Sequence, residues 1–164
     1  MVNLLDQNYY SDSFGFQWNI FEKDQLDSNN KTDLSYKRFK YTKWDLNELE
    51  NNFVLEVGSG AGRFTEILAK SNCKLITLDS SSAIYTNFKN NKHKNIIFLK
   101  CNIEKDIFLD NSFDFVFCYG VIQHTKKPFD TLDFLIKKLK PGGKLSVDFY
   151  RKMYFPTFYS TPKY

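Results

Sequence analysis

The sequence has no long apolar run and no cluster of cysteines. No stretch approaches the roughly 18 uninterrupted apolar residues that a membrane helix needs, and the start from Met1 to Asp6 has neither the basic nor the apolar part of a signal peptide. Cys73, Cys101 and Cys118 stand far apart, which excludes CxxC redox spacing and zinc-ligand spacing. We therefore expect a cytoplasmic protein without a membrane segment or a metal, whose cysteines are reduced.

The chain also has no strong charge imbalance, because 23 Lys and Arg face 19 Asp and Glu for a formal net charge of +4. The lysines are interpreted as scattered rather than gathered in a dense basic block, so no nucleic-acid partner is expected. Short lysine groups are interpreted as solvated helix faces and loops, namely Lys92 and Lys94, Lys126 and Lys127, and Lys137, Lys138 and Lys140. An acidic substrate or partner is the alternative.

What is present is a repeated pattern of short apolar runs that alternate with helical segments from Phe53 onward. This pattern is typical of βαβ units in an α/β protein with a doubly wound parallel sheet, covered on both faces. The predicted strands are Phe53 to Val57, Lys74 to Leu78, Ile96 to Lys100, Phe113 to Cys118 and Lys144 to Phe149. A chain of 164 residues with 42% hydrophobic content is expected to form one domain.

Two helices are predicted after the first two strands. The first carries Phe64, Ile67 and Leu68 at helical spacing. The second begins near Ser81 or Ser82, and either hydroxyl can cap it.

A third helix is predicted from Pro128 to the stop at Pro141-Gly142-Gly143, because proline favours the first turn and the Pro-Gly-Gly run ends a helix. Its predicted core stripe consists of Phe129, Leu132, Ile136 and Leu139.

Three segments are distinguished within the one domain: residues 1–50 as a cap, 51–150 as the core and 151–164 as an aromatic tail. The cap is expected to be helical or irregular, with a loop at Asn29-Asn30. Its aromatic residues are Phe14, Phe16, Trp18 and Phe21. Trp18 is expected either to pack in the core or to share in a ligand pocket.

The run from Val54 to Gly62 ends in a glycine-rich turn, Gly58 to Gly62, which follows the first predicted strand. Three glycines at alternate positions allow a tight turn into a helix, with backbone N–H groups free to meet a nucleotide-like ligand. Dinucleotide-binding proteins use a related GxGxxG, but the spacing here is GxGxG and position 63 is Arg63. Glu56 would suit a ligand that carries an ammonium group.

Asp79 ends the second predicted strand, about twenty residues after the glycines, where a carboxylate can accept from both hydroxyls of a ribose. An ordinary helix-capping aspartate is the alternative.

Four motifs in order give the chain a family resemblance from about Phe53 to Phe149: Glu56 to Gly62, Asp79, Phe113 to Val116 with Val121 to His124, and Leu139 to Leu145. The chain resembles class I S-adenosylmethionine-dependent methyltransferases of the broad bacterial type 11/12 group. The resemblance implies a Rossmann-like sheet, S-adenosyl-L-methionine as cofactor and S-adenosyl-L-homocysteine as product.

The resemblance also implies a set of cofactor-binding residues, with Glu56 at the methionine end, Asp79 at the ribose and Asn102-Ile103 beside the adenine. The full set is Glu56, Gly58, Ser59, Gly60, Asp79, Ser80, Asn102, Ile103 and Tyr119. Many relatives carry Asp where this chain has Asn102, whose amide oxygen can still accept from the adenine amine. Alternatively, Asn102 bonds its own backbone.

His124 is the candidate catalytic base, because its ordinary pKa suits proton transfer near neutral pH. It could equally line the site or be structural, and positioning alone can carry much of a methyl transfer. Tyr119 and Gln123 lie in the same loop and could orient a substrate, although Tyr119 could instead pack against the sheet.

The resemblance implies a seven-stranded sheet of order 3-2-1-4-5-7-6, of which this chain is expected to form 3-2-1-4-5 without the last two strands. An open edge at the fifth strand is expected to be covered by the aromatic tail or by a second copy in a homodimer.

The expected function is methyl transfer to a small-molecule acceptor. A cofactor-binding module without turnover is the second hypothesis. A nicotinamide-dependent dehydrogenase is disfavoured by the GxGxG spacing and by Glu56.

Overall fold

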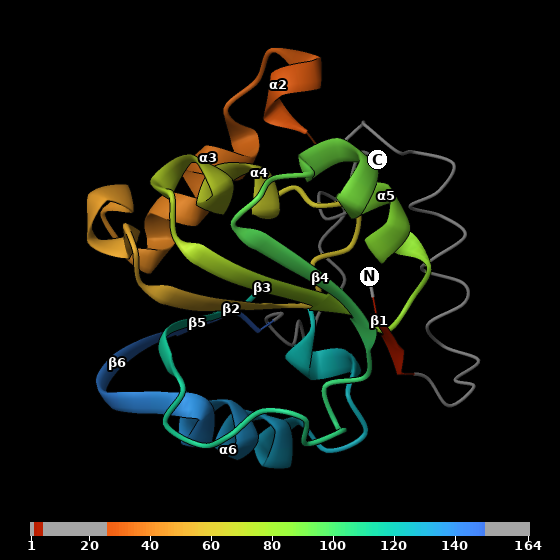
Figure 1. The fold of residues 1–164 in the computed structure, drawn as a ribbon, viewed down its shortest axis with the longest axis vertical. Coiled ribbons are helices and arrows are strands. Elements are labelled where there is room, and N and C mark those ends of the chain that lie inside the picture. Colours follow the sequence, from red (N-terminus) through yellow and green to blue (C-terminus); the bar gives the residue numbers. More distant parts are fainter. Residues whose placement is uncertain (1, 5–25, 150–164) are drawn as a thin grey trace, which may run out of the picture.

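The computed structural model describes residues 2–4 and 26–149, and within them the strands form one parallel sheet of order β1-β4-β3-β2-β5-β6 (Figure 1). The strands are β1 (Val2–Leu4), β2 (Phe53–Val57), β3 (Lys74–Asp79), β4 (Ile96–Cys101), β5 (Phe113–Cys118) and β6 (Leu139–Val147). The run β4-β3-β2-β5-β6 is the predicted order 3-2-1-4-5, which is confirmed together with the α/β class.

Helices cover both faces of the sheet, with α3, α4 and α5 on one face and α6 on the other (Figure 1). The α-helices are α2 (Asp27–Asn30), α3 (Leu34–Phe39), α4 (Thr65–Leu68), α5 (Ala83–Asn91) and α6 (Pro128–Lys138). The short 3-10 helices are η1 (Lys40–Thr42), η2 (Leu46–Leu49), η3 (Ala69–Ser71) and η4 (Ile122–His124).

The core consists of two clusters, one on each face of the sheet, because strands buried on both sides send alternate residues to opposite faces. In β2, Val54 packs with the cluster under α3 to α5, whereas Leu55 packs with the cluster under α6. Phe39 and Trp44 bring α3 and the segment after η1 into the first cluster, where the Trp44 ring lies 5.1 Å from that of Phe115.

The predictions for the first two helices are confirmed. Phe64, Ile67 and Leu68 are all buried beside β2 and β5. The helix α5 begins after its N-cap Ser82, whose side chain makes no capping hydrogen bond, and the Ala83 N–H donates instead to the Ser81 hydroxyl at 3.2 Å.

The predictions for α6 need two corrections. The helix ends at Lys138, and Pro141-Gly142-Gly143 lies inside β6, which begins at Leu139. The predicted core stripe is half right, since Leu132 and Leu139 pack against the core, whereas Phe129 is 79% exposed and Ile136 is 50% exposed. The buried face is instead formed by Thr131, Leu135 and Lys138, which share the same helical spacing but are rotated around the axis.

Lys138 was expected to be solvated, but it is buried because its ammonium group is fully engaged. Its Nζ donates to Asp106 Oδ1 at 2.6 Å, to Asp110 Oδ1 at 2.7 Å and to the Phe108 carbonyl at 2.8 Å. A lysine can be buried when opposite charge and hydrogen bonds replace its water. This contact holds the connection between β4 and β5 against α6.

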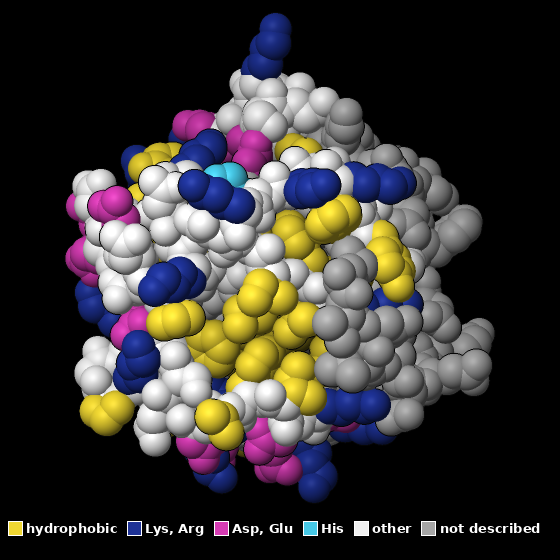
Figure 2. Space-filling model, viewed as in Figure 1, with side chains coloured by type: hydrophobic (Ala, Val, Ile, Leu, Met, Phe, Trp, Pro, Cys, Tyr) yellow, Lys and Arg dark blue, Asp and Glu magenta, His cyan; other side chains and the backbone are white. Residues whose placement is uncertain are grey.

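On the face of the sheet where α6 packs, the helices of the described residues leave part of β4 uncovered. The described chain passes from β4 to β5 without a helix, and Ile97 in β4 is 56% exposed. Figure 2 shows hydrophobic side chains gathered near the centre of the face viewed in Figure 1, between β4 and α6. The expectation that helices cover both faces therefore holds at β2 and β5 but only in part at β4.

The strand β1 was not predicted. Val2–Leu4 pairs in parallel with Leu99, Lys100 and Cys101 of β4, and a three-residue strand carries too short a pattern to recognise. The aromatic residues predicted for the cap, Phe14, Phe16, Trp18 and Phe21, and the tail at 151–164 lie outside the described residues. Within the described residues, no helix is long and apolar enough to cross a membrane.

Candidate functional site

The glycine turn between β2 and α4 has a conformation that requires glycine. Gly58 has a φ of +71° and Gly62 a φ of +97°, both in the left-handed region. A Cβ on Gly58 would lie 2.1 Å from Val121 Cγ2, and one on Gly62 would lie 2.2 Å from Asn87 Oδ1. The turn is therefore packed directly against the loop after β5 and against α5.

Asp79, at the end of β3, connects this turn to the start of α5. Its Oδ2 accepts from the Gly60 N–H at 2.8 Å, and its Oδ1 accepts from the Ser81 N–H at 2.8 Å and the Ser81 hydroxyl at 2.6 Å. A carboxylate can accept about four hydrogen bonds, so three leave capacity for a ribose hydroxyl.

Glu56 lies beneath the turn and is buried, with 1% of its surface exposed. Its Oε2 accepts from the hydroxyls of Thr65 at 2.5 Å and Thr77 at 2.8 Å. Burial in this site raises the pKa of Glu56 to about 7, despite the lowering effect of the two hydroxyls. The carboxyl group is thus poised between its neutral and charged forms near neutral pH.

Asparagines of α5, which the sequence analysis did not single out, hold the turn from the other side. Asn87 Nδ2 donates to the Thr65 hydroxyl at 2.8 Å, which links α5 to the Glu56 network. Asn91 Nδ2 donates to the Gly62 carbonyl at 3.0 Å and Asn90 Nδ2 to the Ala61 carbonyl at 3.2 Å. The spacing of amides on one helical face was the only sequence signal for this contact.

Several buried polar atoms around the turn have no hydrogen-bond partner among the described residues. They are Glu56 Oε1, Ser59 Oγ and both side-chain atoms of the Gln123 amide. Buried polar atoms are nearly always paired in folded proteins. Their position in the turn, beneath it and in η4 fits a polar ligand such as an adenosyl amino acid, whose amine, carboxylate and hydroxyls could pair with them.

The predicted adenine-binding residues follow β4. Asn102 Oδ1 accepts from the Glu104 N–H at 3.0 Å, so this amide bonds its own loop, as the alternative interpretation of the sequence expected. Ile103 is buried under the α6 face and Ser80 is half-buried after β3. Contact of these residues with adenine or ribose stays a prediction.

His124 is exposed at the end of η4, and its role as a base stays a prediction. Tyr119 packs against the sheet side chains, with its ring stacked 4.4 Å from that of Phe117 and edge-on at 5.6 Å to Phe64. Its hydroxyl shares a hydrogen bond of 3.0 Å with the Ser146 hydroxyl.

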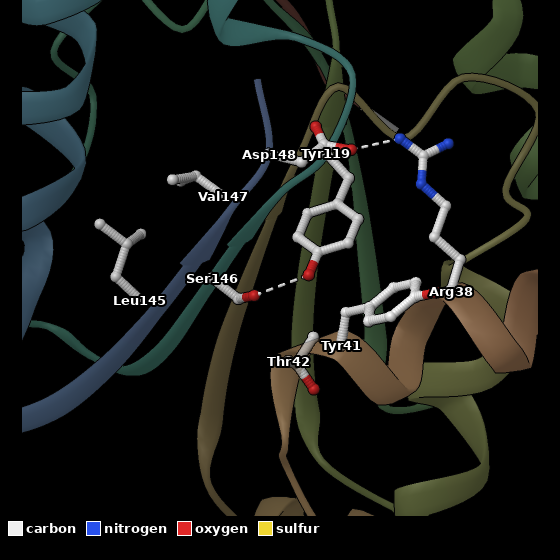
Figure 3. Close-up of a pocket in the computed structure, with 8 residues that line it drawn as sticks. All are labelled: Arg38, Tyr41, Thr42, Tyr119, Leu145, Ser146, Val147 and Asp148. Carbon is white, nitrogen blue, oxygen red and sulfur yellow. Dashed lines mark hydrogen bonds and ion pairs between the residues drawn. The ribbon is translucent and has the colours of Figure 1, made fainter. Parts of the chain in front are cut away.

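A pocket of about 600 Å³ opens beside Tyr119, at the carboxyl ends of β5 and β6 (Figure 3). Ligands of open α/β sheets bind at this edge. The pocket is lined by Arg38, Tyr41, Thr42, Tyr119, Leu145, Ser146, Val147 and Asp148. Tyr119 alone among the predicted site residues lines it, and it joins this pocket to the glycine turn through Phe64.

An ion pair closes one side of the pocket. Arg38 of α3 donates to Asp148 Oδ2 (Figure 3). The Gly120 N–H donates to Asp148 Oδ1. The Arg38 guanidinium also lies 5.7 Å from the Tyr119 ring. The sequence analysis missed Arg38 and Asp148, because a pair 110 residues apart leaves no local signal.

Comparison with known proteins matches the part of the chain that contains the glycine turn and part of the pocket lining. A family model described as "Methyltransferase domain" matches residues 55–147. A tRNA U34 carboxymethyltransferase from Pseudoalteromonas atlantica is 34% identical over 116 residues, covering 65% of this chain and 36% of the relative. A mitochondrial ubiquinone biosynthesis O-methyltransferase from Dictyostelium discoideum is 30% identical over 120 residues, covering 65% and 37%. The chain thus spans little more than a third of these two relatives.

Solved structures agree in fold. A SAM dependent methyltransferase from Aquifex aeolicus matches with a TM-score of 0.58 and 26% identity, over 69% of this chain and 62% of that one. A methyltransferase from Haloferax volcanii, solved with the Trm112 methyltransferase activator, matches with a TM-score of 0.68 and 20% identity, over 83% and 59%. The second likeness bears on the fold alone.

Proposed function

This chain belongs to the methyltransferase-domain family, whose model matches more than half of its length, and we propose that it transfers a methyl group from S-adenosyl-L-methionine to an acceptor in the adjoining pocket. The observation that carries the proposal is the glycine turn, held by Asp79 and surrounded by buried polar atoms without partners. S-adenosyl-L-methionine is the cofactor that the family and the solved Aquifex aeolicus relative support.

The cofactor would be held by groups on three sides of the turn. Glu56 Oε1 would accept from its ammonium group, and Ser59 Oγ is available to its carboxylate. Asp79 has capacity for a ribose hydroxyl, and Ser80, Asn102 and Ile103 follow the neighbouring strands on the side proposed for ribose and adenine. A charged ligand amine beside Glu56 would favour its carboxylate form, so binding would release a proton near neutral pH.

When bound, the cofactor supplies a methyl group on a positively charged sulfur. In the proposed step, the acceptor nucleophile forms a bond to the methyl carbon as the carbon–sulfur bond breaks and S-adenosyl-L-homocysteine leaves. A proton from the acceptor passes to His124 or to solvent. Holding the acceptor in line would supply much of the rate enhancement.

The acceptor is proposed from the size of the pocket and the names of the relatives. A pocket of about 600 Å³ suits one small molecule, which is the first candidate, or one nucleotide unit of a larger acceptor. The second candidate is a nucleotide in RNA, since several curated relatives are named tRNA U34 carboxymethyltransferases. A cofactor-binding module without turnover is the alternative from another functional class.

We also propose that a second copy of the chain covers the outer edge of β6. Within the described residues β6 has no neighbour on that side, and an open edge exposes backbone groups that favour pairing. Light scattering of the purified protein over a range of concentrations tests this, with a dimer expected and a persistent monomer contradicting it.

Calorimetry and a transfer assay test the proposed function together. We expect S-adenosyl-L-methionine and S-adenosyl-L-homocysteine to compete for one site, with no binding of NAD⁺. The protein is then incubated with methyl-labelled cofactor and, separately, total RNA or a small-molecule fraction. Label in either acceptor pool supports transfer, and binding with label in neither favours the module. Absence of cofactor binding overturns both.

A further inference from the structure

The net positive charge of this chain resides in one short segment. Residues 31–44 contain five basic residues and a single acid, Asp33. The basic residues are Lys31, Lys37, Arg38, Lys40 and Lys43. Of 23 basic and 19 acidic residues in the chain, 18 of each sign lie elsewhere, so this segment accounts for the whole formal charge of +4. The basic residues are scattered as expected, since 18 of the 23 lie elsewhere, but the excess of positive charge lies in this segment.

The core fixes which side chains of this segment face outward. Phe39 and Trp44 are buried, with exposures of 1% and 9%, and both pack against Phe117. Between them, Lys40, Tyr41 and Lys43 are exposed on η1 and its end. The basic residues are thus presented by a backbone that is anchored on the sheet.

Exposed aromatic rings alternate with the basic residues. Tyr41 is 80% exposed and Tyr36 is 40% exposed. Lys40 Nζ lies 5.1 Å from the Tyr36 ring. Cations interleaved with exposed rings provide the two contacts used for single-stranded nucleic acid, namely phosphate pairing and base stacking.

The positive charge is only partly neutralised by neighbouring carboxylates. Lys37 pairs with Asp33 and Arg38 pairs with Asp148. Lys40 and Lys43 form no ion pair within the part of the chain that the structure describes. No carboxylate of the described residues therefore neutralises these two lysines.

The same segment forms one wall of the pocket beside the glycine turn. Arg38, Tyr41 and Thr42 line that pocket, and Tyr119 and Ser146 lie across from them (Figure 3). An anionic chain that crosses Lys40 and Lys43 would therefore pass the mouth of the pocket. A small acceptor would need only one such cation, whereas basic residues spread over 14 positions suit a polyanion.

We propose that residues 31–44 and this pocket form a binding surface for single-stranded RNA, in which one nucleotide enters the pocket beside Tyr119. This inference rests on the proposed function, which it deepens by naming the acceptor class. Lys40 and Lys43 pair with phosphates, Tyr41 stacks on a base at the rim, and Arg38 meets the phosphate of the inserted nucleotide by exchange with Asp148. The surface replaces the earlier expectation that no nucleic acid binds.

Fluorescence anisotropy with a labelled single-stranded RNA of roughly 12 nucleotides tests the proposal, because this length fits the usual site size of such surfaces. With three phosphate contacts, a plot of the logarithm of the binding constant against the logarithm of the salt concentration should have a slope of about −2. Lys40→Glu with Lys43→Glu should weaken binding at least about tenfold. Tyr41→Ala should weaken it about tenfold.

Matched controls separate this surface from general charge and aromaticity. Lys92→Glu with Lys94→Glu makes the same charge change at exposed positions after α5, and Tyr85→Ala removes a ring that is 41% exposed on α5. Both controls should keep RNA binding within about threefold, well below the effect of losing a phosphate contact. Equal losses in the test and control pairs would overturn the proposal, as would absence of RNA binding by the unaltered chain.

Two further measurements distinguish the possible failures. Calorimetric binding of S-adenosyl-L-methionine should be unchanged in the Lys40→Glu, Lys43→Glu variant, so RNA loss with intact cofactor binding supports the surface specifically. Cofactor binding without RNA binding in the unaltered chain overturns the surface but leaves the proposed function standing. Binding to phosphatidylserine vesicles that depends on the same lysines, without RNA binding, would assign the surface to membranes and overturn the proposal.

Discussion

Asp79 at the end of β3 accepts a hydrogen bond from the backbone N–H of Gly60 at 2.8 Å. This contact joins the turn after β2 to the end of the neighbouring strand β3, at the edge where the cofactor is proposed to bind. It fixes the direction of the turn's N–H groups while leaving the carboxylate within reach of a ribose.

Replacement of this carboxylate should weaken cofactor binding. In Asp79→Ala, the Gly60 N–H and the Ser81 N–H lose their acceptor and the ribose loses its partner. Since a hydrogen bond to a charged group contributes about 1.5 to 3 kcal/mol, the Kd for S-adenosyl-L-methionine should rise at least about tenfold by calorimetry. Asp79→Asn keeps one acceptor oxygen and should lose less. An unchanged Kd in Asp79→Ala would show that Asp79 does not contribute to cofactor binding.

Glu56 should make the stability of the fold depend on pH. Its pKa is raised from 4.5 to about 7 in the folded chain by burial, so the folded state holds a proton that the unfolded state has lost between these values. The free energy of unfolding should therefore fall as the pH rises through this window, by up to about 3 kcal/mol.

The matched variant is Glu56→Gln, which keeps the shape of the side chain and cannot ionise. Urea unfolding at about pH 5 and about pH 8 should show a smaller loss of stability in this variant than in the unaltered chain. An identical pH dependence in both proteins would show that Glu56 is not the group responsible.

Gly58 should tolerate alanine far less well than Gly142 does. Both have positive φ, +71° and +81°, so alanine carries a similar backbone cost at each. Only at Gly58 would the new Cβ collide with Val121, at 2.1 Å, whereas nothing lies within 4 Å at Gly142. Thermal unfolding should show a lower Tm for Gly58→Ala than for Gly142→Ala, and equal values would mean that the turn is not packed against the loop after β5.

His124→Ala should separate binding from chemistry. The side chain is exposed in η4, and the side-chain hydrogen bonds that hold the glycine turn come from Asp79 and α5, so cofactor affinity should be unchanged. If His124 is the base, transfer to an identified acceptor should fall by about 10² to 10⁴. His93→Ala, at another exposed histidine, is the control. Equal loss of cofactor affinity in His124→Ala and Asp79→Ala would refute this division of roles.

The strands and the glycine turn were predictable because their signals are local. β2 and β5 match their predicted ranges, since Phe53–Val57 is apolar at every position except Glu56 and is followed at once by the glycine turn. Gly58 was recognisable in the sequence, because a side chain at this positive φ would collide with Val121 of the neighbouring loop, so glycine is required there.

The features that could not be predicted depend on distant partners. Phe129 fits a core pattern as well as Leu135 does. The face of α6 that is buried includes Lys138, whose partners Asp106 and Asp110 lie in the connection between β4 and β5, far from α6 in the sequence. The pair of Arg38 with Asp148 likewise brings together residues 110 apart. The basic segment at 31–44, in contrast, was visible in the sequence and required only a local count of charges.

The central claim is that an adenosyl cofactor occupies the glycine turn, and a crystal structure with S-adenosyl-L-homocysteine tests it most directly. We predict electron density for the ligand along Gly58 and Gly60, with its ribose at Asp79 and its amine toward Glu56. Density for the ligand at another place, or a turn that stays without ligand at saturating concentration, would contradict the claim.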